Sequence, residues 1–208
     1  MTDKTLEEKQ KILDTLIKKV DKEMGVGTLQ RASDALRNGV FDLKIFPTPS
    51  PELNGMLWCG GFSGIVELYG PQMGGKTSLA IDTIALSQKN DPNFVGGWLE
   101  TEGGISKEYL QDHGVDLSRF YYFRQEDTGN GENAMDVLRG ILKTGAIDFI
   151  VVNSVAGLAP QKEVEDDLDK QNIALTARLM SKFFRTSNMN ISKNKTCVVF
   201  INQTRDNV

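Results

Sequence analysis

The chain has 208 residues, of which 39% are hydrophobic and 25% charged, and a formal net charge of -4. This composition is typical of a soluble globular protein, and the length fits one α/β domain with a small appendage. The acidic balance excludes a global positive field for nucleic acid, so any contact with DNA must be local. The two cysteines, Cys59 and Cys197, fit neither a zinc site nor a disulfide framework, and no apolar run reaches the length of a membrane span. We therefore expect a cytoplasmic protein with no membrane partner.

The N-terminal segment has the pattern of an amphipathic helix over residues 5–24. Thr5 followed by Glu8 fits a capping box, and Gly25 and Gly27 end the pattern. We assign residues 1–30 to an N-terminal helix and linker, whose apolar stripe packs either on its own domain or on a neighbouring subunit. The stripe consists of Leu6, Leu13, Leu16, Ile17, Val20 and Met24.

Residues 31–208 form the predicted main domain, which starts irregularly. The stretch "FPTPSPELNG" holds three prolines in six residues, which excludes a helix or a central strand through it. From residue 64 onward, apolar strands alternate with helices, which predicts an α/β fold with a mostly parallel sheet covered on both faces. The strands are expected at 64–70, 95–100, 119–123, 148–153 and 196–203, and the helices at 76–90, 106–114, 131–145 and 172–190.

A phosphate-binding loop is predicted where the first of these strands meets the first helix. The stretch "GPQMGGKT" matches G-x-x-x-x-G-K-S/T in the strand–loop–helix context that the motif requires. Backbone N–H groups of the loop and the helix N-terminus would hold the phosphates of ATP, and Lys76 would reach the β- and γ-phosphates. The Thr77 hydroxyl would ligate Mg²⁺. The predicted nucleotide-binding residues are Gly70, Pro71, Gln72, Met73, Gly74, Gly75, Lys76, Thr77 and Ser78.

Two further strands end in polar residues that suit a nucleotide site. Glu102 follows the strand at 95–100 and is placed to deprotonate an attacking water, although Glu100 and Glu102 could also be solvated loop acids. Asn153 ends the strand at 148–153, where an aspartate would accept hydrogen bonds from Mg²⁺-bound water. The carbonyl of Asn153 can still accept, without negative charge, so we expect a weak, water-mediated contact with the metal. Asp148 begins the same strand and lies too far away to substitute.

Four motifs resemble, in their order and spacing, the RecA family of homologous recombinases. They are "GIVELYGPQMGGKTSLA", "FIVVNSVAGLAPQKEVE", "ALTARLMS" and "VVFINQTR". The resemblance covers residues 7–205. It implies a RecA-type P-loop ATPase core and DNA-dependent hydrolysis of ATP. Protomers would form a helical filament on single-stranded DNA with ATP at subunit interfaces, pair it with homologous duplex DNA, and exchange strands in recombination and repair. The N-terminal helix would then dock on the neighbouring protomer.

The resemblance also assigns roles to single residues. Glu102 would be the catalytic carboxylate, assisted by Lys76, and Gln203 the sensor of the γ-phosphate that communicates with a DNA loop. Tyr109 would stack on adenine. The plain alternatives are a strand-end polar residue for Gln203 and a core or surface tyrosine for Tyr109. The single histidine, His113, is interpreted as a capping or surface residue.

DNA contacts are expected from cations near two loops. The first DNA loop would cover residues 161–172, which are rich in acids, and the second would begin near the last residues of the chain. The contacts are assigned to Lys170, Arg178 and Arg205. The family pattern continues beyond residue 208, so we expect a shortened relative, a fragment or a split gene. Together with Asn153, this leaves an alternative function: an ATP-binding, hydrolysis-poor module that joins or caps recombinase filaments.

Overall fold

The computed structural model describes residues 3–165 and 174–204, which separate by their contacts into two compact units, Met1–Asp42 and Leu43–Val208. The first unit contains α1 (Leu6–Met24) and α2 (Ala32–Arg37). The predicted capping box is present: the Thr5 N–H donates to Glu8 Oε2 at 2.9 Å, and the Glu8 N–H donates to Thr5 Oγ1 at 3.3 Å. No side chain of α1 is buried, and Leu6 is 71% exposed. Within this unit, four residues of the apolar stripe predicted from the sequence, Leu6, Leu13, Leu16 and Met24, are exposed, and Ile17 and Val20 are half-buried.

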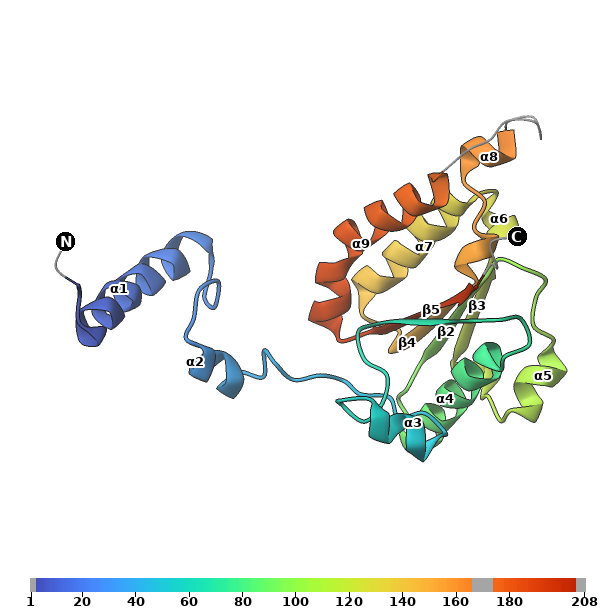
Figure 1. Cartoon of the computed structure of the whole chain (residues 1–208), viewed down its shortest axis with the longest axis horizontal. Helices are drawn as coiled ribbons and strands as arrows, with labels where there is room; N and C mark the ends of the chain where they lie inside the picture. The colour runs from blue at the N-terminus through green and yellow to red at the C-terminus, as the bar shows by residue number, and fades with distance from the viewer. Residues whose placement is uncertain (1–2, 166–173, 205–208) are drawn as a thin grey trace. The chain divides into compact units, whose positions relative to one another are not determined.

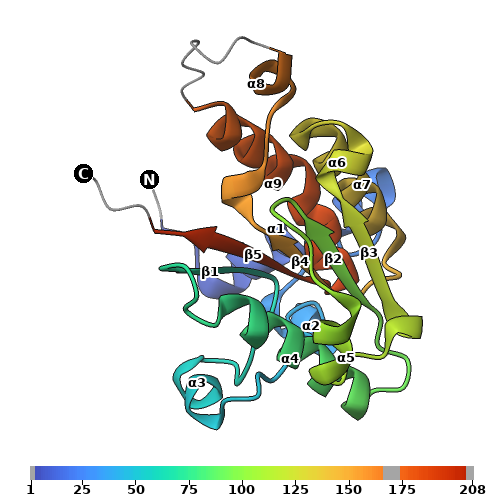
Figure 2. The same ribbon diagram turned by 90° about the vertical axis from the view of Figure 1, so that its right-hand side faces the viewer.

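The described part of the second unit is built on a five-stranded parallel sheet in the order β1-β5-β4-β2-β3 (Figures 1 and 2). The strands are β1 (Ile65–Gly70), β2 (Gly96–Glu100), β3 (Phe120–Arg124), β4 (Phe149–Asn153) and β5 (Cys197–Gln203). Because every strand runs the same way, their carboxyl ends meet at one edge of the sheet. That edge is where ligands bind in open α/β sheets.

Helices cover both faces of the sheet (Figures 1 and 2). Alternate residues of one strand enter different cores: Val151 packs in the cluster that includes Ile81 of α4, and Val152 packs in the cluster that includes Leu138 of α7. The helices are α3 (Pro51–Met56), α4 (Lys76–Asn90), α5 (Lys107–Asp112), α6 (Gln125–Thr128), α7 (Gly131–Thr144), α8 (Gln161–Glu165) and α9 (Leu175–Asn194). The predicted α/β architecture with a doubly covered parallel sheet is confirmed.

The proline-rich stretch departs from the prediction, because α3 begins inside it. Pro51 occupies the first turn of α3, where a missing N–H costs no intrahelical hydrogen bond. The Ser50 side chain caps the helix by accepting a hydrogen bond from the Leu53 N–H at 3.2 Å. Proline in this stretch therefore starts a short helix instead of preventing one.

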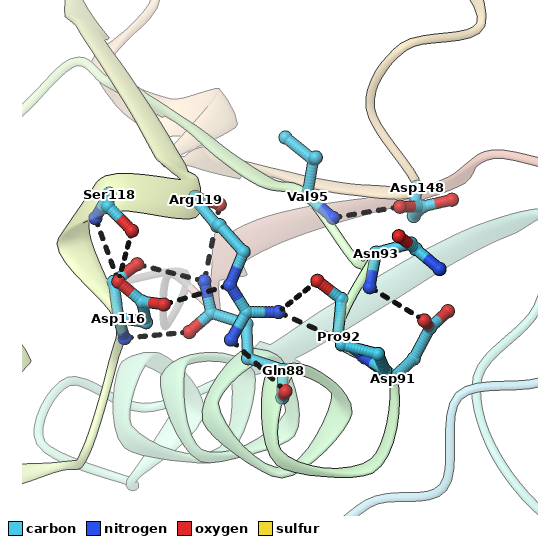
Figure 3. A network of polar contacts seen from close by, with 9 residues as sticks. All are labelled: Gln88, Asp91, Pro92, Asn93, Val95, Asp116, Ser118, Arg119 and Asp148. Atoms are coloured by element: carbon cyan, nitrogen blue, oxygen red, sulfur yellow. Dashed lines mark hydrogen bonds and ion pairs between the residues drawn. The ribbon is translucent and has the colours of Figure 1, made fainter.

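A clamp fastens the C-terminal end of α4 at the edge of the sheet opposite the expected site (Figure 3). The Arg119 guanidinium donates to the carbonyls of Gln88 at 3.2 Å, Asp91 at 3.0 Å and Pro92 at 3.1 Å. It also donates to Asp116 Oδ2 at 2.8 Å. A cation placed on the last carbonyls of a helix satisfies groups that have no intrahelical partner and is favoured by the helix dipole.

Carboxylates at this edge are used for structure. Hydrogen bonds from the Ser118 side chain and from Arg119 lower the pKa of Asp116 from 3.8 to about 2. Asp148, directly before β4, accepts a hydrogen bond from the Val95 N–H at 2.8 Å (Figure 3). Asp148 thus lies at the opposite end of β4 from Asn153, as expected from the sequence.

Candidate functional site

The predicted phosphate loop connects the end of β1 to the start of α4, at Gly70 and Lys76. Gly75, directly before the helix, has a φ of 79°, a left-handed conformation that favours glycine. The Lys76 ammonium donates to the carbonyls of Gly70 at 2.9 Å and Pro71 at 2.7 Å. Backbone carbonyls of the loop therefore bind the Lys76 ammonium at the N-terminus of α4, a helix of fifteen residues.

A line of hydrogen bonds joins the loop to the carboxyl ends of three other strands. Gln72 Nε2 donates to Gln203 Oε1 at 3.1 Å, and Gln203 Nε2 donates to Glu102 Oε1 at 2.8 Å. The Ser154 hydroxyl donates to the same oxygen of Glu102. The structure thus brings together Glu102 and Gln203, which lie 101 residues apart in the sequence, and connects both to the phosphate loop.

Glu100 is a buried carboxylate, only 3% exposed, so its interpretation as a solvated loop acid is wrong. It accepts hydrogen bonds from Trp98 Nε1 at 3.0 Å, from the Glu102 N–H at 2.9 Å and from the Thr101 N–H at 3.1 Å. Asn153 Nδ2 adds contacts of 3.0 and 3.3 Å to the two carboxylate oxygens. Burial of a carboxylate is tolerated when donors surround it in this way.

The amide of Asn153 has one chemically sensible orientation beside Glu100. An oxygen at the position of Nδ2 would place an acceptor against the carboxylate, so the nitrogen must face Glu100 and Oδ1 must face the other way. Sequence analysis missed this pair. The available signal was that Glu100 and Asn153 end their strands, and these two residues are register partners in the pairing of β2 with β4.

Tyr109 lies on α5 and contacts the first turn of α4. Its hydroxyl is 2.8 Å from Ser78 Oγ, and its ring centroid is 4.4 Å from that of His113. His113 is the C-cap of α5, as interpreted from the sequence, but its Nδ1 also lies 2.5 Å from Asp82 Oδ1 on α4. The contact of His113 with α4 was not predicted.

The comparisons with known proteins agree with this arrangement. A family model described as the RecA N-terminal domain matches residues 11–208. The chain belongs to the RecA family. "Protein RecA" of Bacteroides thetaiotaomicron is 34% identical over 203 residues, which cover 97% of this chain and 59% of that protein. "Protein RecA" of Staphylococcus aureus strain JH9 is 35% identical over 203 residues, which cover 97% of this chain and 56% of that protein.

This RecA-family chain thus spans less than two thirds of the length of these curated relatives. The resemblance stated from the sequence motifs is confirmed at the level of the family. In the described ranges, no helix is both long and apolar enough to cross a membrane.

The residues predicted to contact DNA are described only in part. Arg178 is exposed near the start of α9. Lys170 and Arg205 lie outside the described residues, as does most of the predicted first DNA loop, of which α8 forms the beginning. The assignment of these three cations to DNA therefore stays a prediction.

Two neutral side-chain oxygens, those of Thr77 and Asn153, are the candidate contacts for Mg²⁺. Thr77 is in the first turn of α4, and its hydroxyl is the predicted metal ligand. Asn153 ends β4 with Oδ1 directed away from Glu100. Both groups are neutral oxygens, which Mg²⁺ accepts when phosphate supplies the negative charge. The donor set therefore fits a metal that arrives with a nucleotide.

Proposed function

We propose that this chain is the ATP-binding and ATP-hydrolysing core of a RecA-type recombinase that acts on DNA. The observation that supports this most strongly is the hydrogen-bonded line from Gln72 through Gln203 to Glu102. A loop of the phosphate-binding type is thereby coupled to a carboxylate that can serve as a general base. Such coupling is what an ATPase needs in order to activate water only when the nucleotide is in place.

The nucleotide would be held by the loop from Gly70 to Ser78. Its amides and the N-terminus of α4 would bind the phosphates, and Lys76 would exchange its carbonyl partners for the β- and γ-phosphates. Thr77 would ligate Mg²⁺ directly, and Asn153 Oδ1 would accept from water on the metal. The metal would neutralise charge that develops on the transferred phosphoryl group.

Glu102 would deprotonate the water that attacks the γ-phosphate in line. In the structure, its Oε1 already accepts from Gln203 and from Ser154. If the Gln203 amide turns toward a γ-phosphate, Glu102 loses one donor and becomes a better proton acceptor. Gln203 would in this way act as the sensor that links nucleotide binding in the loop to the reactivity of Glu102. Its movement would also be transmitted to the residues that follow β5.

The proposal extends to filament formation on single-stranded DNA, which the family resemblance implies. The largely exposed stripe of α1 would pack on a neighbouring protomer, so that residues 1–30 would serve oligomerisation and residues 31–208 would form the core. Lys170, Arg178 and Arg205 would bind DNA phosphates, making binding sequence-independent and sensitive to salt. The filament would pair its strand with homologous duplex DNA for strand exchange in recombination and repair, in the cytoplasm.

Asn153 favours a second candidate function. Its amide is used to hold Glu100, and it brings no negative charge to the metal. A chain of this kind could bind ATP, hydrolyse it poorly, and join or cap filaments of an active recombinase. The two candidates differ in turnover, and not in binding of ATP.

Steady-state hydrolysis of ATP with Mg²⁺, with and without single-stranded DNA, tests the proposal. Stimulation by DNA is expected, and Lys76→Ala should remove both binding and turnover of ATP. Lys89→Ala is the matched control, since it removes an exposed lysine from the other end of α4. Binding without turnover would favour the filament-capping module, and ATP binding that survives in Lys76→Ala would refute the phosphate-loop assignment.

A further inference from the structure

Two matched side-chain contacts connect α4 with α5 beside the phosphate loop. Ser78 and Asp82 are four residues apart on α4, and Tyr109 and His113 are four residues apart on α5 and its C-cap. Residues at this spacing lie on the same side of a helix. The Ser78–Tyr109 contact of 2.8 Å and the Asp82–His113 contact of 2.5 Å therefore form two successive rungs between the helices.

The two rungs fix the ring of Tyr109. Ser78 holds the hydroxyl at one end, and the His113 ring packs against the Tyr109 ring with centroids 4.4 Å apart and planes at 52°. The backbone of Tyr109 is held as well, because its N–H donates to Ser106 Oγ at 3.0 Å. A tyrosine side chain has two main torsions, so contacts at its tip and on its ring determine both.

α5 depends on these contacts more than a long helix would. It spans only Lys107–Asp112, and so short a helix is not stable without tertiary packing. Its own buried apolar anchor is Leu110, which packs in the core, while the Asp82–His113 rung fastens the C-terminal end. Loss of that rung would free the end of α5 and allow the ring of Tyr109 to turn.

The position of Tyr109 suits recognition of a nucleobase. Ser78 is the last residue of the loop predicted to bind the phosphates, so the ring is fastened to the turn that would carry them. A nucleoside triphosphate bound there would extend its ribose and base beyond the loop, and the half-buried ring of Tyr109 on the neighbouring helix is a candidate surface for the base. Stacking on such a ring contributes affinity that a bare polyphosphate cannot obtain.

We propose that Asp82 and His113 are positioning residues that set the ring of Tyr109 for the base, so that this site prefers a nucleoside triphosphate to inorganic tripolyphosphate. This inference rests on the proposed binding of ATP in the loop. Asp82 acts through His113, and His113 acts through Tyr109. The pair therefore contributes to the affinity for the base and not to the affinity for the phosphates.

The test compares two ligands by calorimetric titration in Mg²⁺: ATP, and inorganic tripolyphosphate, which has no base. The variants are Asp82→Ala, His113→Ala and the double variant. ATP affinity should fall by about two- to tenfold in each single variant, while tripolyphosphate affinity should change by less than about twofold. The double variant should lose no more than either single one, because the residues act in series. Asp112→Ala, which removes an exposed acid from α5, is the matched control and should bind both ligands normally.

Each result decides between the possibilities. An equal loss of affinity for both ligands would show that the Asp82–His113 contact supports the loop itself, and would overturn the proposal. Unchanged ATP affinity in the single variants, or additive losses in the double variant, would overturn it as well. Tripolyphosphate binding also reports that each variant retains a folded loop. If the unmodified chain binds neither ligand, the proposed function fails, a result distinct from loss of selectivity alone.

Discussion

Replacing Asn153 by Asp should destabilise the protein, even though an aspartate is the residue expected at a metal-associated strand end. The substitution keeps the size of the side chain but replaces the Nδ2 donor, 3.0 Å from Glu100 Oε2, by a carboxylate oxygen. Glu100 is 3% exposed and Asn153 is 8% exposed, so water cannot screen the two charges effectively.

The magnitude follows from the contacts that are lost and the repulsion that is created. A hydrogen bond to a charged group contributes about 1.5–3 kcal/mol, and the new carboxylate beside Glu100 would be an uncompensated buried charge, which costs about 3–5 kcal/mol. We therefore expect the free energy of unfolding to fall by about 3–5 kcal/mol. In a chain of this size each kcal/mol lowers Tm by about 2–4 °C, so the total shift should be on the order of 10 °C.

The assay is urea unfolding at neutral pH, without nucleotide and with a chelator, so that no metal offsets the new charge. Asn153→Ala is the control, because it removes the donor without adding a carboxylate and should cost about 1–3 kcal/mol. An Asn153→Asp protein as stable as the unmodified chain would refute the reasoning. It would mean that the Glu100 carboxylate can turn away from its neighbour and that this strand end readily carries a second negative charge.

Three further predictions concern other parts of the fold. The pKa of Asp116 is lowered from 3.8 to about 2 in the folded state, so its charged form stabilises the folded state above about pH 4. The unmodified chain should therefore be more stable than Asp116→Asn near neutral pH, and this difference in the free energy of unfolding should shrink as the pH falls from 3.8 to about 2. Urea unfolding at each pH measures it. Burial raises the pKa of the Cys197 thiol, so a thiol reagent should modify the half-buried Cys59 first and reach Cys197 only on unfolding, as followed by mass spectrometry. Gly157→Ala should lower Tm by several degrees, because a Cβ at this position would lie 2.5 Å from Thr101 Oγ1 and 2.7 Å from the backbone oxygen of Thr101. Gly140→Ala is the control, because a Cβ there meets no atom within 4 Å.

The elements of the core were predictable because their signals are local. α4 was expected at 76–90 and spans Lys76–Asn90, since a glycine-rich loop defines its start and its apolar positions recur at helical spacing. The strands shifted by only one residue at some ends, because they are continuous apolar runs between polar turns. The start of α3 at Pro51 was missed, because proline prevents a helix in its interior and favours one in its first turn.

The side-chain contacts of the site were less predictable. The phosphate loop is a contiguous motif, so its position follows from the sequence. The Glu100–Asn153 pair joins residues 53 apart, and the Asp82–His113 pair joins residues 31 apart. Such contacts depend on strand order and on how one helix lies against another, which local patterns do not determine.

If the phosphate loop binds a nucleotide as proposed, the Arg119 clamp affects how a movement of that loop could reach the rest of the fold. α4 is about 22 Å long at 1.5 Å per residue, and at its far end Arg119 donates hydrogen bonds to the carbonyls of Gln88, Asp91 and Pro92. Because these hydrogen bonds hold that end of the helix, we expect α4 to resist sliding along its own axis when the phosphate loop moves. A change at the phosphate loop would then be transmitted across the carboxyl ends of the strands, where Gln203 already bonds to Gln72 and to Glu102.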